Sequence, residues 1–106
     1  MITIKQGETY IKRLELKTVD TRQPIDLTGY TAYSQMRDRP GGTLAAQGSC
    51  SITASTGVIL VTYSSGQTSG IAPGEYGFDI WIKSGNEKHP LYTSRVKVVK
   101  SYTENM

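Results

Sequence analysis

Few side chains in this sequence could take part in catalysis or metal binding. Its 106 residues include one histidine, His89, and one cysteine, Cys50. A nucleophile activated by a histidine and a carboxylate would have to use His89. Its place beside Pro90 in an expected hairpin does not favour a rigidly held general base. A zinc site needs three or four His, Cys or carboxylate ligands. We therefore predict no catalytic site, no metal site and no cofactor.

Paired carboxylates and glycine-rich loops give no stronger signal. Two carboxylates can hydrolyse a glycan when they face each other across a cleft, and Asp26, Asp38 and Asp79 are the candidates. Asp79 falls within an expected strand and Asp38 at the end of one, so no pair is placed across a cleft. The glycines match no phosphate-binding motif and fall in expected turns, where positive φ suits glycine. Cys50 is expected to be a small, partly buried hydrophobe.

The charge balance and the length exclude further classes of protein. Twelve Lys and Arg and nine acidic residues give a net charge of +3, and the two signs are interleaved. A nucleic-acid binder usually gathers its basic residues into a stripe, so we predict no nucleic-acid partner. The longest apolar run, Val58–Val61, is too short for a secretory signal or a membrane span. We expect residues 1–106 to form one domain. We also expect the chain to be synthesised in a reducing cytoplasm.

Alternating apolar residues and regularly spaced turns predict strands throughout. Thr, Ser and seven Tyr favour strands, and no window has the apolar period of a core-facing helix. Val58–Tyr63 is apolar on both faces and is predicted to be central. The segment 64–73 has room for one helical turn. The expected strands are Ile2–Lys5, Thr9–Lys17, Thr31–Asp38, Thr43–Gln47, Ser51–Thr53, Val58–Tyr63, Glu75–Lys83 and Leu91–Lys100.

Roughly seven or eight strands in one domain predict an all-β fold, an immunoglobulin-like antiparallel sandwich. A small Greek-key barrel is the alternative. Tyr76 follows a Pro-Gly corner, where a sandwich places a tyrosine whose hydroxyl bonds back to the corner backbone. Antibody-type hallmarks are missing, so the prediction concerns architecture alone. Ile2–Lys5 and Leu91–Lys100 are candidate edge strands, open to pairing between subunits.

Two surface features complete the prediction. At the corner Pro24–Tyr30, Ile25 and Leu27 are expected beneath the end of the sandwich, with Asp26 capping the turn. The outward positions of the third, sixth and seventh strands of such a sandwich share one sheet. They carry aromatic and Arg side chains, which are enriched in protein interfaces. The alternative is that Arg37 or Arg95 stacks on Trp81 and covers it. The candidate interaction face comprises Tyr33, Arg37, Trp81, Lys83 and Arg95.

The order of several turn motifs resembles a group of small phage and prophage structural proteins. That group includes the N-terminal domain of baseplate upper proteins and short proteins of other tailed phages. The resemblance spans nearly the whole chain. The motifs are Gln6-Gly-Glu-Thr-Tyr10, Pro24-Ile-Asp-Leu-Thr-Gly-Tyr30, Gln35-Met-Arg37, Pro40-Gly-Gly42, Thr56-Gly57, and Pro73-Gly-Glu-Tyr76 with Phe78-Asp79-Ile80.

The resemblance implies a non-enzymatic virion component of the tail, baseplate or neck, whose copies bind other virion proteins or one another. It places Asp26, Tyr30, Tyr76 and Asp79 as structural corner residues, with an Arg37–Asp79 pair across adjacent strands. The chain stops at Met106 where larger baseplate proteins continue, so a head accessory role stays open. A host-receptor or glycan-binding module, with Tyr33 and Trp81 stacking on sugars, is an alternative function. An inhibitor of a host protein is another.

Overall fold

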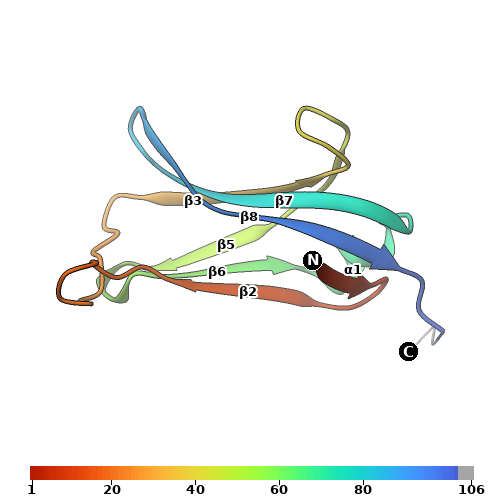
Figure 1. Ribbon diagram of the computed structural model, residues 1–106, viewed down its shortest axis with the longest axis horizontal. Helices are drawn as coiled ribbons and strands as arrows, with labels where there is room; N and C mark the ends of the chain where they lie inside the picture. Colours follow the sequence, from red (N-terminus) through yellow and green to blue (C-terminus); the bar gives the residue numbers. More distant parts are fainter. Residues whose placement is uncertain (103–106) are drawn as a thin grey trace.

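The computed structural model describes residues 1–102 and consists of two β-sheets packed face to face (Figure 1). One sheet has five strands in the order β1-β8-β7-β3-β4, and the other has three in the order β2-β6-β5. Their bounds are β1 Ile2–Lys5, β2 Tyr10–Glu15, β3 Thr31–Arg37, β4 Leu44–Gln47, β5 Ser49–Thr53, β6 Val58–Tyr63, β7 Gly74–Ser84 and β8 Glu87–Val99. A 3-10 turn at Ala54–Thr56 and a short helix, α1 Ser65–Ser69, complete the described elements.

The strand order confirms the predicted all-β sandwich, but β1 pairs with β8 in parallel, so the sandwich is not antiparallel throughout as predicted. β3, β7 and β8 share one sheet, while β2, β5 and β6 share the other, as in immunoglobulin-like domains. The alternative of a small barrel is wrong, because the strands divide into two separate sheets. β6 is central in its sheet, as predicted, but Leu60 on its outer side is 38% exposed, so only one face is covered. β8 lies between β1 and β7, so its prediction as an edge strand is wrong.

Alternation within the strands places the core between the sheets. The inward residues of β3 and β7 follow the predicted phase, with Met36, Phe78 and Ile80 almost fully buried. The Phe78 ring, from the five-stranded sheet, lies 6.1 Å from the Tyr10 ring and 5.9 Å from the Tyr63 ring, both edge-on and both from the opposite sheet. Phe78 comes two residues after Tyr76, where antibody domains carry their second cysteine. An aromatic cluster therefore joins the sheets in place of a disulfide.

The corner tyrosine forms as predicted. The Tyr76 hydroxyl donates to the Ala72 carbonyl over 2.7 Å, which ties the start of β7 to the preceding loop. The helical turn expected in segment 64–73 is also present as α1, where Ser64 and Gln67 form a capping box. The buried Thr68 hydroxyl donates to the Glu8 carbonyl over 2.6 Å and fixes α1 against the β1–β2 turn.

The corner at residues 24–30 is partly as predicted. Asp26 caps the turn: its Oδ1 accepts from the Thr28 hydroxyl at 2.6 Å and from the Thr28 amide at 3.0 Å. These two bonds, the hydroxyl bond first, lower the pKa of Asp26. Leu27 is buried, but Ile25 is 36% exposed and does not lie beneath the sandwich. The Ile25 amide donates to the Leu16 carbonyl. The segment therefore runs beside the end of β2, and Pro24, Ile25 and Asp26 are all exposed before the chain turns in at Leu27.

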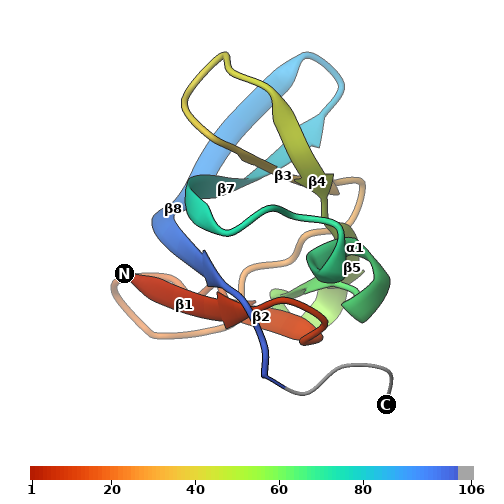
Figure 2. The same ribbon diagram turned by 90° about the vertical axis from the view of Figure 1, so that its right-hand side faces the viewer.

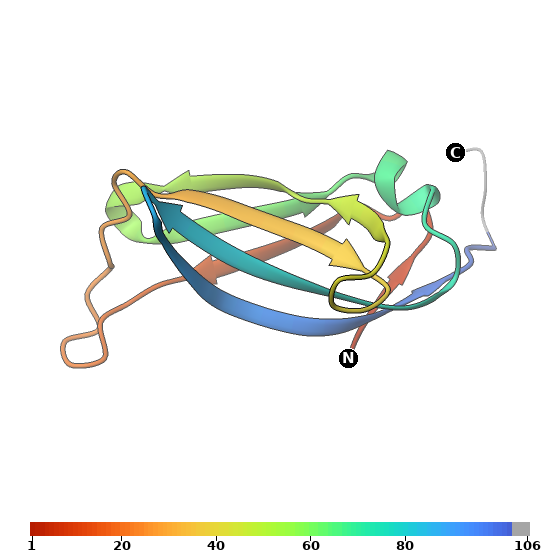
Figure 3. The ribbon, with the colours of Figure 1, turned by 90° about the horizontal axis from the view of Figure 1, so that it is seen from above.

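Gly48 lies at the crossing between the two sheets, where β4 leads directly into β5 (Figure 3). It separates β4, in the five-stranded sheet, from β5, in the three-stranded sheet. Its amide donates to the Ser34 carbonyl at 2.9 Å, and a Cβ here would come within 2.8 Å of a Val61 methyl group. The absence of a side chain thus permits the close approach of the two layers at the crossing.

The polar pair buried between the sheets makes the stability of the fold depend on pH in the alkaline range. Tyr63 Oη and Ser34 Oγ lie 2.8 Å apart, and burial raises the pKa of Tyr63 to about 12. The unfolded chain releases this proton near pH 10, so the contribution is complete below pH 10 and lost as the pH rises towards 12. We expect wild-type stability to fall by about 2 kcal/mol from this group alone across that range.

The variant Tyr63→Phe tests this expectation by urea unfolding from pH 8 to pH 12. It leaves Ser34 without its partner and so costs about 1 kcal/mol at pH 8. Its stability should nevertheless decline less steeply above pH 10 than that of the wild type. Burial also raises the pKa of Tyr10 and Cys50, so some alkaline loss persists. Parallel curves for the two proteins would contradict the assignment.

Candidate interaction surface

A groove of about 650 Å³ lies on the outer face of the five-stranded sheet. Strands β3, β7 and β8 form its floor, and residues 38–41 of the β3–β4 hairpin form one wall. Both this hairpin and the β7–β8 hairpin rise above the sheet on that side (Figures 1 and 2). The wall is a turn segment, while the floor is a ladder of paired strands.

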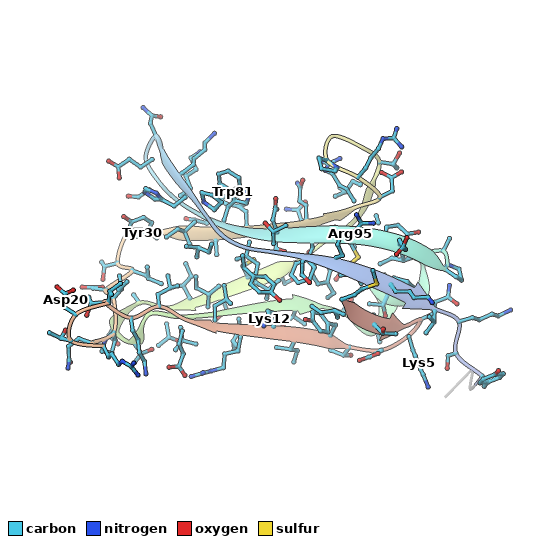
Figure 4. All side chains as sticks on the ribbon, in the orientation of Figure 1. Lys5, Lys12, Asp20, Tyr30, Trp81 and Arg95 are labelled. Atoms are coloured by element: carbon cyan, nitrogen blue, oxygen red, sulfur yellow. The ribbon has the colours of Figure 1, made fainter. Side chains whose placement is uncertain are left out.

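Two aromatic side chains dominate the floor. Tyr33 and Trp81 are directly opposite each other on β3 and β7 and are 46% and 37% exposed. Trp81 points away from the sandwich (Figure 4). At Trp81 the β7–β8 register shifts, and Pro90 becomes its partner. A bulge accommodates proline because proline has no amide proton for the ladder.

Trp81 is not covered by an arginine, so the alternative that Arg37 or Arg95 stacks on its ring is wrong. In residues 1–102 the single cation–π contact found joins Lys12 Nζ and the Tyr92 ring at 4.6 Å. Arg37 is occupied elsewhere: its guanidinium donates to the Gly42 carbonyl at 2.7 Å and to Gln35 Oε1 at 2.9 Å. Arg37 therefore positions the hairpin wall, and Trp81 stays open to a partner.

Asp79 occupies the middle of the groove floor. Its neighbours in register are Gln35 on β3 and Thr93 on β8. The predicted Arg37–Asp79 pair does not form among the described residues, because Arg37 lies opposite Gly77 and bonds to Gly42 and Gln35. Asp79 was expected with the structural corner residues, but the fold places it in the groove.

The other predicted face residues are divided between the groove and its surroundings. Arg95 is exposed and lines the groove with Tyr33, Arg37 and Trp81. Lys83 does not line it; it lies farther along β7, opposite Thr31 and Lys88. The hairpin wall was missed by sequence reasoning, although the turn motif Pro40-Gly-Gly42 was noted between two predicted strands. A turn motif indicates where a chain reverses and not how high the loop stands above the sheet.

The groove offers recognition by stacking, hydrogen bonding and charges of both signs.

The cysteine and the histidine lie outside the groove. Cys50 is half-buried, and burial raises the pKa of its thiol, which disfavours the nucleophilic thiolate. His89 is exposed on β8, with its Nε2 3.8 Å from a Glu87 carboxylate oxygen. Across residues 1–102 no group of three His, Cys, Asp or Glu is placed to hold a metal ion. None of the helices in this part of the chain is long and apolar enough to cross a membrane.

Comparison with solved structures shows a likeness of fold, while the comparisons of sequence find no match. No protein-family model matches the chain, and no curated protein matches it. The fold is similar to a solved structure described as the N-terminal domain of phage TP901-1 ORF48. The match has 12% sequence identity and a TM-score of 0.49, and it covers 92% of this chain and 83% of that chain.

Proposed function

We propose that this protein is a non-enzymatic structural or assembly component of a tailed phage particle, acting through protein–protein contacts in its tail, baseplate or neck. The observation that carries the proposal is the exposed Tyr33–Trp81 pair in a groove on a rigid sheet. The phage assignment is supported by the chain-long order of turn motifs, from the Gln6-Gly-Glu-Thr-Tyr10 opening to Pro73-Gly-Glu-Tyr76.

The chemistry of the groove favours a protein partner. An exposed Trp beside a Tyr is the kind of anchor that dominates binding energy in protein interfaces. Asp79 and Arg95 provide opposite charges in the same groove, which suits a partner surface of mixed charge. The 650 Å³ volume accommodates a loop or hairpin of a neighbouring virion subunit beside the raised β3–β4 hairpin.

The test is binding between the purified chain and the virion proteins encoded beside it, measured by co-purification and then by titration. The change Trp81→Ala should weaken the complex about 30-fold, as expected for a hot-spot residue worth ~2 kcal/mol. Tyr102→Ala is the matched control, because Tyr102 is fully exposed and does not line the groove. The proposal fails if no virion protein binds the wild type, or if Trp81→Ala and Tyr102→Ala have equal effects.

A second function, binding of a host glycan, is favoured by the same aromatic pair. Sugar rings stack on aromatic faces, and Asp79 and Gln35 lie opposite each other beside the pair to accept or donate hydrogen bonds. A glycan array separates the two functions. Sugar binding that Trp81→Ala abolishes, without any virion protein binding, would favour the glycan.

A further inference from the structure

β5 is an edge strand whose outer side is unprotected. It pairs with β6 alone in the described chain, and Ser49, Ser51 and Thr53 are exposed. Beyond β5, the Ala54 carbonyl accepts the Leu27 amide at 3.0 Å, so the open stretch ends there. An edge of this kind presents free N–H and C=O groups to any other strand, and natural proteins normally block it.

The opposite edge of the same sheet carries the expected protection. On β2, the Lys12 ammonium lies 4.6 Å from the centre of the Tyr92 ring, so its charge is held against the core side of the strand. Arg13 and Glu15 form an ion pair next to it. Charged and inward-pointing residues are devices that prevent strand addition. β2 is therefore a poor site for a further strand.

The edges of the five-stranded sheet are also less open than β5. β1 has four residues and ends at Lys5. β4 has four residues, and its terminal Gln47 carbonyl accepts Gln67 Nε2 at 2.6 Å. β5 has five residues, contains no charge and no proline, and lies with β4 in a run between Arg39 and Glu75 that has no charged residue. β5 therefore lacks the charges that oppose the addition of a further strand.

We propose that β5 pairs antiparallel with β5 of a second copy of this chain, about a twofold axis. In such an isologous contact residue i of one copy faces residue j of the other, and j faces i. With the axis at Ser51, Ser51 meets Ser51 and Ser49 meets Thr53. A charged residue at the axis would face its own charge, and β5 has none. Ser and Thr pairs across strands stabilise a ladder through their hydroxyls. The two three-stranded sheets then form one continuous sheet, while each groove stays on the other sheet.

The test is the mass in solution by light scattering and sedimentation over a concentration series. We expect a wild-type dimer, and at least a tenfold weaker dimer for Ser51→Lys, because the two ammonium groups would meet at the axis. The control Thr3→Lys adds the same charge at an exposed position on the edge strand β1 and should leave the dimer unchanged. Mixing Ser51→Lys with Ser51→Glu should restore association as a mixed dimer.

Hydrogen exchange gives a readout that requires no variant. Amide protons of β5 should become more protected as the wild-type concentration rises, while those of β2 should not. A monomer at every concentration would overturn the proposal. So would a dimer that Ser51→Lys leaves intact, or one that Thr3→Lys weakens equally. Trp81→Ala should retain the dimer, so failure of this proposal and failure of the proposed virion contact are distinguishable.

Discussion

Gly57→Ala is expected to lower the free energy of unfolding by about 3 kcal/mol. Gly57 has a φ of 66°, in the left-handed region. A Cβ there would lie 2.6 Å from the Leu16 carbonyl oxygen and 2.8 Å from that of Ile25. Both oxygens belong to the backbone, and the Leu16 amide is itself bonded to the Gly57 carbonyl at 2.9 Å. The chain therefore has no inexpensive way to move aside.

Gly85→Ala separates the two causes of that loss. Gly85 has a φ of 58°, and a Cβ there would meet nothing within 4 Å, so the substitution retains the backbone strain without the clash. We expect a loss of about 1 kcal/mol for this control. Urea unfolding at neutral pH measures both variants. Equal losses would show that crowding at Gly57 contributes nothing.

Phe78→Ala is expected to cost about 4 kcal/mol, the upper range for truncating a core aromatic residue. Phe78 is 2% exposed and contacts Tyr10, Tyr63 and Tyr92 with ring centres about 6 Å away. Removing the ring leaves a cavity between the sheets and ends three aromatic contacts. Since a domain of this size is stable by roughly 5–15 kcal/mol, the variant should unfold at a markedly lower urea concentration.

Two further variants check that the loss reflects burial at the junction. Phe78→Leu keeps most of the apolar volume and should cost much less than Phe78→Ala. Tyr33→Ala removes an aromatic ring from the outer face of the neighbouring strand and should cost less than 1 kcal/mol, because that ring is 46% exposed. If Tyr33→Ala matched Phe78→Ala, the aromatic cluster would not be the main link between the sheets.

Alternation and turn residues were sufficient to predict most of the fold. All eight predicted strands form, and Tyr76 makes the predicted corner bond. Each of these features depends on residues that are close in sequence. The start of β8 was missed, because Pro90 suggested a loop. Its position at the bulge opposite Trp81 lets the ladder continue to Glu87.

The sequence predicted which strands form the floor of the groove, and it did not predict that the β3–β4 hairpin forms a wall beside them. Strand phase placed Tyr33, Trp81 and Arg95 on one surface, and all three line the groove. The role of Arg37 depends on where the hairpin carbonyl of Gly42 lies, which is a tertiary feature. The expected Arg37–Asp79 pair failed for the same reason. The alternation of residues along a strand does not indicate whether an arginine will bond to a neighbouring carboxylate or to a nearby backbone oxygen.

The parallel pairing of β1 with β8 has a mechanical consequence. Ile2 lies beside Val96 and Lys5 beside Val99, so the first and last strands run side by side in the same direction. A load pulling β1 towards its N-terminal end and β8 towards its C-terminal end would act along both strands at once. All the bonds between them would resist together, instead of opening one after another. A force applied through β1 and β8 therefore loads their hydrogen bonds in shear, and this geometry resists more force than opening the bonds one at a time.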